Sequence, residues 1–327
     1  MSQEYLDAVT SRNPDHWFRF EETSGTSTVD AVTSSSRSLT LGSTGTLDAS
    51  TGLANAGSAL WLPGSWNPPA NAAAFLNMGQ MQTFWERTER TISFVMATTQ
   101  GVTTNTSYVY GYEDDAIPGG DLVEHALAIN RWYDYDPDTD SGVYIHEEGS
   151  LLGWYGYIDD YFGSWAGKWQ WWMIRQQDLT VNWRDGEPHH WVLTEKLDPT
   201  GQGLNECRLW IDKQEQPLTI MQSGQLAELP VVAPRTYMPL GGRRYEGSFT
   251  GTIYGVAATY DEFIAFPGLL VQEDVDDLYD KLTTASEPEP EPEWQHIARV
   301  PVATLEYLDE DVTPGDYVYQ VFPVVSD

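Results

Sequence analysis

The stretch FTGTIYGVAATYDEFIAFPGLLVQEDVDDLY, residues 249–279, decides the fold of this chain. Its first part, GTIYGVAATYDEFIAF (251–266), is rich in β-branched and aromatic residues and predicts a long strand. The chain then runs into VQEDVDDLYDKL (271–282), which has acidic residues in its first turns and predicts a helix. The apolar residues of this helix recur at the spacing i, i+4, i+7 and i+11: Val271, Val275, Leu278 and Leu282. We therefore expect a strand followed by a helix that ends a domain.

Upstream of this stretch, the chain reads as many short strands separated by Gly, Pro, Asn and Asp. These strands are HWFRF (16–20), ALWL (59–62), TISFVMAT (91–98), SYVYGY (107–112), HALAINRWY (125–133), GVYIHE (142–147), WQWWMIR (169–175), HWVLTEKL (190–197) and CRLWID (207–212). Helical periodicity is nearly absent between them. Strands at this density predict an all-β sandwich of two sheets, with one short C-terminal helix.

Five strings along the chain together resemble the laminin-G-like, concanavalin A-type jelly rolls. They are PDHWFRFEETSGTSTVDAVTSSSRSLTLG (14–42), GSALWLPG (57–64), HHWVLTEKL (189–197), RLWIDKQEQ (208–216) and the closing stretch 249–279. The third string departs from the family, because Trp191 follows the two histidines where the family has Trp before them. The resemblance implies a jelly roll over residues 1–285, with a Trp-rich insertion around 98–188 that holds extra hairpins or long loops.

A boundary follows the helix. SEPEPEPE (286–293) alternates Pro and Glu, which predicts an extended spacer. The last segment, 294–327, is similar to the second half of a fibronectin type III domain, and Tyr317 matches its tyrosine-corner region. So few strands cannot bury a core of their own, so we expect them to pair with another chain or to dock on the sandwich. The residues that we expect to serve assembly are Tyr307, Tyr317, Tyr319 and Val321.

The charge of the chain excludes several classes of partner. Among 327 residues there are 49 Asp and Glu against 17 Lys and Arg, which gives a formal net charge of -32. Nucleic acid is excluded, because binding phosphates requires clustered Lys and Arg. No run of about 18 apolar residues occurs, so we expect no membrane insertion. The first residues, MSQEYLDAVTSRNPDHW, lack a basic start and an apolar core, so we expect no Sec signal.

The basic residues are mostly Arg, with only 4 Lys. A carboxylate-rich surface poor in Lys suits concentrated salt, because a Debye length of about 3 Å at 1 M screens self-repulsion. We interpret the chain as a halophilic, acidic protein. The alternatives are an ordinary acidic protein and one whose acidic loops hold metal ions.

We expect no enzymatic activity. The Glu-x-Asp-x-Glu constellation of hydrolytic relatives of this fold is absent, and Asp261 and Glu262, being adjacent on a strand, should point to opposite faces. No Gly-x-Ser-x-Gly elbow, P-loop or His-Glu-x-x-His motif is present. Cys207 lies in a predicted strand and reads as a buried small residue, not as a nucleophile. We therefore name no catalytic residues.

One acidic segment makes calcium a candidate ligand. In DYDPDTDSGVYIHE, oxygen ligands stand at positions 1, 3, 5 and 12 of a calcium-loop pattern: Asp136, Asp138, Asp140 and Glu147. The glycine required at position 6 is Ser141, and Pro137 interrupts the pattern. The alternative is a solvated hairpin turn in an acidic protein. No other cofactor is indicated.

The stretch GWYGYIDDYFGSWAGKWQWWMIR (153–175) is unusually rich in aromatic residues. Alternate residues on a strand share a face, and aromatic faces can stack on sugar rings. The candidates for glycan binding are Trp154, Tyr157, Trp165, Trp169 and Trp171. The alternative is that these rings fill the core or an oligomer interface, which is the commoner role of large aromatic residues.

Three classes of function remain open, and one fits best. A jelly roll followed by an acidic spacer and a half-module resembles the tail, fibre, baseplate and head-decoration proteins of tailed viruses. We therefore expect a non-enzymatic virion structural protein of a salt-loving host such as an archaeon, made in the host cytoplasm and located on the virion surface. Its expected partners are other virion proteins, further copies of itself in a homo-oligomer, and a host-surface glycan or glycoprotein. The alternative is an exported cell-surface carbohydrate-binding module, and a hydrolase is the third class.

Overall fold

The computed structural model describes most of the chain up to the end of the predicted helix. The described residues are 2–22, 27–34, 36–41, 46–49, 59–65, 74–77, 81, 84, 87–98, 107–114, 122–136, 141–158, 167–197, 204–223, 239–241 and 255–284. The chain divides into two units, Met1–Ser286 and Glu287–Asp327, and the described residues all belong to the first. Neither helix in this part of the chain has the length and apolar content needed to cross a membrane.

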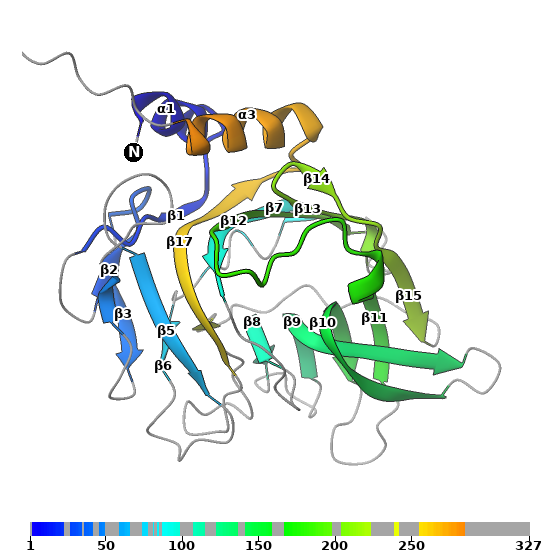
Figure 1. Cartoon of the computed structure of the whole chain (residues 1–327). Coiled ribbons are helices and arrows are strands. Elements are labelled where there is room, and N and C mark those ends of the chain that lie inside the picture. The colour runs from blue at the N-terminus through cyan, green and yellow to red at the C-terminus, as the bar shows by residue number, and fades with distance from the viewer. Residues whose placement is uncertain are drawn as a thin grey trace, which may run out of the picture. The chain divides into compact units, whose positions relative to one another are not determined.

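The first unit is an all-β sandwich of two antiparallel sheets, as the sequence predicts (Figure 1). In the back sheet the order is β4–β5–β17–β7–β12–β13–β14, and β1 also pairs with β17. The strands of the back sheet are β1 (His16–Phe18), β4 (Thr46–Ala49), β5 (Ala59–Ser65), β7 (Glu89–Ala97), β12 (His189–Leu197), β13 (Leu204–Ile211), β14 (Gln214–Glu215) and β17 (Gly255–Pro267).

In the front sheet the order is β2–β3–β6–β16–β8–β9–β10–β11–β15. The strands of the front sheet are β2 (Ser27–Val29), β3 (Ser36–Leu41), β6 (Ala74–Asn77), β8 (Ser107–Asp114), β9 (Leu122–Asp136), β10 (Ser141–Ile158), β11 (Gly167–Ile174), β15 (Thr219–Ser223) and β16 (Pro239–Leu240). Among the described residues, a parallel bridge from Gly255 to Tyr108 and an antiparallel bridge from Phe18 to Asp30 link the two sheets. The region 98–188, expected as an insertion, holds β8 to β11 and so forms much of the front sheet itself.

The core lies between the sheets and is built on aromatic residues. Phe94 on β7 and Trp191 on β12 stack with their ring centroids 5.9 Å apart and their planes 7° apart. Trp183 comes from the loop before β12 and meets Trp191 edge-on at 5.5 Å. Each of these three side chains is at most 1% exposed. Aromatic pairs of this geometry add roughly 0.5–1.5 kcal/mol beyond the burial of their area, so they fix β7 and β12 against the loop.

Two helices cover the outer face of the back sheet (Figure 1). The predicted C-terminal helix is present as α3 (Gln272–Thr283), whose Val275, Leu278 and Leu282 are buried. The second helix, α1 (Gln3–Ser11), was not expected from the sequence, because its buried set is only Tyr5, Ala8 and Val9. So short a stripe gives little periodic signal.

Side-chain bonds tie the two helices together. Arg12, just after α1, donates to the carboxylates of Asp274 and Asp277 on α3, with N···O distances of 2.9 and 3.0 Å. At the start of α1 the hydroxyl of Ser2 accepts from the backbone N–H of Tyr5 as an N-cap and donates to the carbonyl of Lys281. These bonds hold both ends of α1 against α3.

A β-bulge in β17 corrects one prediction. The register between β17 and β7 shifts between Asp261 and Ile264, and Glu262 has a backbone φ of 51°. The bulge breaks the alternation that would place Asp261 and Glu262 on opposite faces. Asp261 is the Cα partner of Val95, and Glu262 accepts from the indole of Trp17 at 2.6 Å; Val95 and Trp17 both pack with α1 on the outer face of the back sheet. The prediction of opposite faces is therefore wrong.

Candidate functional site

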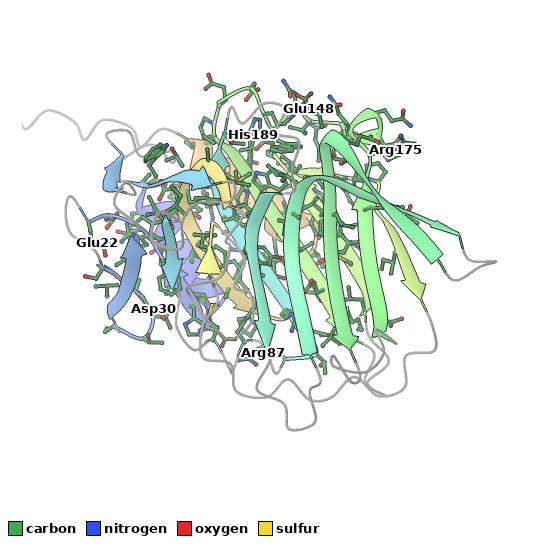
Figure 2. The ribbon with its side chains drawn as sticks, turned by 90° about the horizontal axis from the view of Figure 1, so that it is seen from below. Glu22, Asp30, Arg87, Glu148, Arg175 and His189 are labelled. Carbon is green, nitrogen blue, oxygen red and sulfur yellow. The ribbon has the colours of Figure 1, made fainter. Side chains whose placement is uncertain are left out.

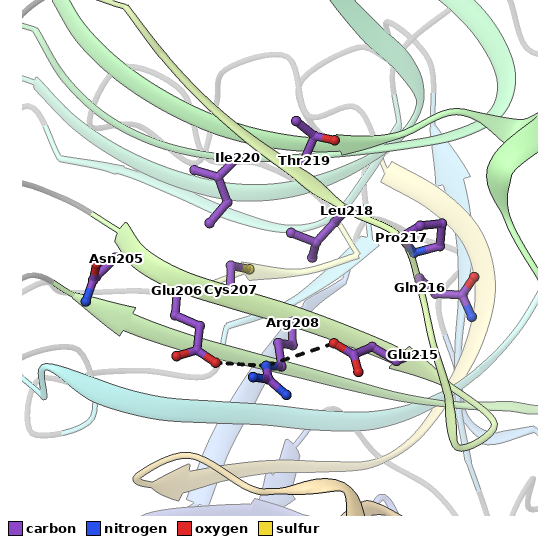
Figure 3. Close-up of a pocket in the computed structure, with 10 residues that line it drawn as sticks. All are labelled: Asn205, Glu206, Cys207, Arg208, Glu215, Gln216, Pro217, Leu218, Thr219 and Ile220. Carbon is purple, nitrogen blue, oxygen red and sulfur yellow. Dashed lines mark hydrogen bonds and ion pairs between the residues drawn. The ribbon is translucent and has the colours of Figure 1, made fainter.

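An open groove runs along one side of the sandwich, between β13 of the back sheet and β15 of the front sheet (Figure 3). Its volume is about 830 Å³, within the range of roughly 300–1,000 Å³ typical of ligand sites. The residues that line it are Asn205, Glu206, Cys207, Arg208, Glu215, Gln216, Pro217, Leu218, Thr219 and Ile220. They come from two segments, one on β13 and the other running from the end of β14 into β15.

Strand pairing explains why the groove is open. β13 pairs with β12 along its length, but with β14 only at Trp210 and Ile211. β15 pairs with β11. Within the described part of the chain, β15 is thus the last strand of the front sheet on this side, β13 is an edge before Trp210, and the two strands do not pair with each other. The groove occupies the gap between them.

The outer rim of the groove is charged. Arg208 lies between two carboxylates, with its Nε 2.8 Å from Glu206 Oε1 and 3.9 Å from Glu215 Oε1 (Figure 3). All three side chains are about half exposed, at 51%, 43% and 48%. The guanidinium is thus shared between two acids, and the rim carries one more negative than positive charge.

The inner wall of the groove is apolar. Cys207 is 5% exposed and faces the core together with the partly buried Leu218 and Ile220. Burial raises the pKa of the Cys207 thiol well above its ordinary value, and the nearby charge of Glu195 raises it further. The prediction that Cys207 is a buried small residue is therefore confirmed, and the thiol is held protonated.

Behind this wall lies an ion pair inside the sandwich. Arg90 on β7 donates to Glu195 on β12, with Nε 2.8 Å from Oε2. The two side chains are 0% and 3% exposed. Removing either partner would leave a charge in the interior, so the pair fixes the registry of β7 against β12 next to the groove.

Two hydrogen bonds between Gln216 and Thr180 fix the end of the groove nearest the loop before β12. The side-chain carbonyl of Gln216 accepts from the backbone N–H of Thr180 at 3.0 Å, and its amide donates to the hydroxyl of Thr180 at 2.7 Å. Gln216 is 2% exposed. Its two bonds hold the segment between β14 and β15 in place, so the groove is shaped by the fold and not by a free loop.

The tryptophan candidates stand on the strands next to the groove. Trp154 on β10 is the Cα partner of Trp171 on β11, which in turn pairs with Met221 on β15. One row along, Trp169 pairs with Gly156 and Ser223. Trp172 alternates with them, is 1% exposed and belongs to the core. By the two-residue period of a strand, Trp154, Trp169 and Trp171 occupy register positions on the face opposite to Trp172.

The other glycan candidates are not brought into this row. Tyr157 pairs with Lys168, in the rows that alternate with those of Trp154 and Trp169. Trp165 lies outside the described residues. The assembly candidates Tyr307, Tyr317, Tyr319 and Val321 also lie outside them.

The calcium candidates are not brought together where they are described. Asp136 ends β9 as the Cα partner of Ser141, whereas Glu147 lies six residues further along β10. The carboxylate of Glu147 accepts from the guanidinium of Arg175, at 2.8 and 3.0 Å, and from the backbone N–H of Gln176. Arg175 and Glu148 lie on the same rim of the sandwich (Figure 2). Asp138 and Asp140 lie outside the described residues, and within those residues no cluster of acidic, His or Cys side chains is suited to a metal ion.

A second polar cluster lies beside the turn between β13 and β14. Asp212 and Lys213 have φ of 50° and 66°, the conformation of a two-residue hairpin turn. His189 lies between two acids, with Nδ1 2.5 Å from Asp212 and Nε2 3.0 Å from Asp185. Burial by itself would lower the pKa of His189, but the hydrogen bonds with Asp212 and Asp185 outweigh it and raise the pKa. The cluster ties the loop before β12 to the hairpin.

Sequence reasoning missed the groove. In the sequence of β13, charged residues alternate with apolar ones at Glu206, Cys207, Arg208 and Leu209, which could have indicated a strand with one charged and one apolar face. What the alternation could not reveal is that β15 faces this strand, because the two belong to different sheets. The string 208–216, one of the five that resemble the jelly-roll family, spans the β13–β14 hairpin.

Comparison with known proteins finds only a loose likeness. No protein-family model matches the chain, and no curated protein matches it. Among solved structures, a Trypanosoma rangeli sialidase in complex with 2,3-difluorosialic acid is similar, with a TM-score of 0.44 and 11% identity over 84% of this chain and 34% of that one. A botulinum neurotoxin serotype D binding domain in complex with N-acetylneuraminic acid has a TM-score of 0.47 and 11% identity, over 84% of this chain and 52% of that one.

This likeness concerns the fold. The chain spans about a third of the length of the sialidases and about half that of the neurotoxin domains. It nevertheless corrects the expectation that the chain is not an enzyme, because the similar structures include sialidases, which are enzymes, beside receptor-binding domains. At these identities and TM-scores the likeness assigns neither an activity nor a ligand.

Proposed function

We propose that the chain recognises carbohydrate for adhesion to a surface, at the end of the front sheet formed by β10, β11 and β15 and in the groove beside it. The observation that carries the proposal is the register of the tryptophans. Trp154 and Trp171 are direct cross-strand partners, and Trp169 follows in the next row of the same face. Three indoles at neighbouring positions of one sheet face would offer adjacent platforms for stacking sugar rings.

The groove supports the same function. β15 pairs with β11 on one edge and lines the groove on the other, so the tryptophan rows end where the groove begins. The groove combines an apolar wall at Leu218 and Ile220 with amide and carboxylate groups at Asn205 and Glu206. Sites for small polar ligands have this composition, with apolar walls and a few polar groups that set the orientation.

The decisive experiment compares tryptophan variants on a glycan array. The wild type is screened first, and the best binders are then measured by calorimetry against a W169A/W171A double variant. The matched control is W61A, because Trp61 is 38% exposed on β5 of the back sheet and lies outside the proposed site. We expect at least a tenfold loss of affinity in the double variant, which is about 1.4 kcal/mol, and no loss in W61A.

Two results would refute the proposal. If no glycan binds the wild type above background, the carbohydrate function is wrong. If glycans bind but W61A loses as much affinity as W169A/W171A, the site lies elsewhere. Far-ultraviolet circular dichroism and thermal unfolding of each variant establish that a loss of binding is not a loss of fold.

As a finer proposal, this adhesion takes place on a virion surface. The support is the order of parts along the chain, with a sandwich, the Pro-Glu spacer 286–293 and a short C-terminal segment that we expect to assemble with other copies or other virion proteins. The composition, with -32 net charge and only 4 Lys, supports a salt-loving host. The competing setting is an exported cell-surface module, whose C-terminal segment would have no role in assembly.

Light scattering separates these two settings. The full chain and a version truncated after Ala285 are compared in about 2 M salt, where electrostatic screening is nearly complete. A discrete oligomer that becomes monomeric on truncation supports assembly through the C-terminal segment. Two monomers contradict the assembly role and leave the surface module.

A further inference from the structure

We infer that the proposed site takes sugars without acidic groups and rejects acidic ones such as sialic and uronic acids. This inference rests on the proposed function, and it adds the chemical class of the ligand. It follows from how the charges of the groove are arranged. Of the ten residues that line the groove, Arg208 is the one cation.

The arginine is flanked by two acids. Its Nε is 2.8 Å from Glu206 Oε1 and 3.9 Å from Glu215 Oε1, so the guanidinium charge is shared between two carboxylates. A sugar carboxylate that bound the other donors of Arg208 would lie close to both acids, and like charges in proximity are unfavourable. The acids on the rim therefore oppose the binding of a further anion at Arg208.

The net charge acts in the same direction. Two carboxylates and one guanidinium give the rim a formal charge of about -1, in a chain of net charge -32. A field of this sign lowers the local concentration of anions and slows their association. Rejection by like charge is an effective means of specificity, because it penalises the wrong ligand without weakening the right one.

The same groups suit a neutral sugar. Sugar hydroxyls donate hydrogen bonds, and the carboxylates of Glu206 and Glu215 are strong acceptors on the rim. The side-chain amide of Asn205 can both donate and accept. The wall formed by Leu218 and Ile220 offers apolar contact to the C–H faces of a ring. Each of these contacts is available to an uncharged hexose without breaking the Arg208 pairs.

The test uses matched pairs of oligosaccharides, each neutral chain beside its sialylated or uronic acid counterpart. Binding to the wild type is measured by calorimetry at about 0.1 M salt and again at about 1 M, where the Debye length falls from about 10 Å to 3 Å. We expect the neutral member to bind at least tenfold more tightly at low salt, and the difference to shrink at high salt. Equal or tighter binding of the acidic member at low salt would overturn the inference.

A charge-neutralising variant makes the test specific to the groove. In E206Q/E215Q the acids that hold Arg208 become amides of nearly the same shape, so we expect the acidic member to gain at least tenfold in affinity. The control is E4Q on the exposed side of α1, away from the groove, which should leave the preference unchanged. If E206Q/E215Q folds but keeps the wild-type preference, the groove does not set it and the inference fails.

Different results would refute the carbohydrate function and the preference for neutral sugars. Absence of binding to every glycan refutes the proposed function. Binding that favours the acidic partner refutes the inference and leaves the function standing.

Discussion

The indole of Trp172 lies across the backbone of Gly153, its direct partner in the β10–β11 ladder. A Cβ built on Gly153 would be 2.1 Å from Cε2 and 2.3 Å from Nε1 of Trp172. Only a glycine leaves room for the ring, which is 1% exposed. This contact commits Trp172 to the core, so the alternating positions of β11, Trp169 and Trp171, fall on the other face of the strand.

Gly153→Ala should therefore destabilise the sandwich by about 1–3 kcal/mol, the usual cost of overpacking a core. The cost should shrink in a W172F background, because phenylalanine lacks the ring atoms that the new methyl would meet. Urea unfolding of the two single variants and the double variant gives the coupling. An unchanged cost of G153A in the W172F background would show that the two residues do not press on each other.

The buried ion pair makes a second prediction. Arg90→Met leaves the Glu195 carboxylate in the interior with its guanidinium partner gone, and we expect a loss of about 3–5 kcal/mol in the free energy of unfolding. R90M/E195L, which removes both charges, should be more stable than R90M. Urea unfolding at constant salt measures both.

The same two strands offer the matched control. Lys196 on β12 and Glu89 on β7 are direct cross-strand partners with side chains 36% and 46% exposed. Because exposed pairs contribute little, K196A should change stability by less than about 1 kcal/mol. A loss in K196A as large as that in R90M would contradict the assignment of the interior pair as the costly one.

His189 predicts a dependence on pH. Its pKa is raised in the folded state by hydrogen bonds with Asp212 and Asp185, in spite of burial. A raised histidine pKa stabilises the fold fully below the unfolded value of about 6.5, and the contribution is lost as pH rises through the folded value. Wild-type stability should therefore fall above pH about 6.5, whereas H189Q should fall less.

The titration of His190 does not affect stability in the pH range used to test His189. Burial lowers the pKa of His190 to about 4. Its contribution to stability therefore changes only at pH values below the unfolded pKa of about 6.5, where it lowers the stability as the pH falls. Denaturant unfolding of the wild type and H189Q over pH 6.5–9 isolates His189 as the difference between them. Parallel curves would mean that its bonds to the two acids do not stabilise the cation.

Glu262 makes a fourth prediction. Burial raises the pKa of its carboxyl well above the ordinary value, and the charge of Asp261 raises it further, so the folded state favours the protonated acid. Such a group destabilises the fold as pH rises from the unfolded value of about 4.3 through the folded one. E262Q keeps a neutral group of the same shape beside Trp17, which donates to Glu262 at 2.6 Å. The stability of E262Q relative to the wild type should therefore increase with pH, and a constant difference from pH 4 to 8 would contradict the assignment.

The strands and the C-terminal helix could be predicted because their signals are local. The apolar spacing of Val275, Leu278 and Leu282 marks α3, and the turn at Asp212 and Lys213 is visible as the end of a strand-like run. The helix α1 escaped prediction because Tyr5, Ala8 and Val9 give too short a stripe, and its stability comes from α3 and the back sheet. The bulge at Glu262 escaped because no local rule places a glutamate inside a strand in a left-handed conformation.

The candidate site was predictable only in part. The sequence pointed to the tryptophans of 153–175 but left open whether they are core or surface, and the register separates Trp172 from Trp169 and Trp171. The groove depends on β13 and β15 belonging to different sheets, which is a long-range relation. The calcium pattern stays a prediction, since Asp138 and Asp140 lie outside the described residues, although the carboxylate of Glu147 already bonds to Arg175.

The most direct test of carbohydrate recognition is a crystal structure of the chain with the neutral oligosaccharide that binds best on the array. We predict sugar rings over Trp154, Trp169 and Trp171, with hydroxyls reaching the groove near Glu206. Sugar bound on the back sheet around Trp61, or at any site that touches neither the tryptophan rows nor the groove, would contradict the account.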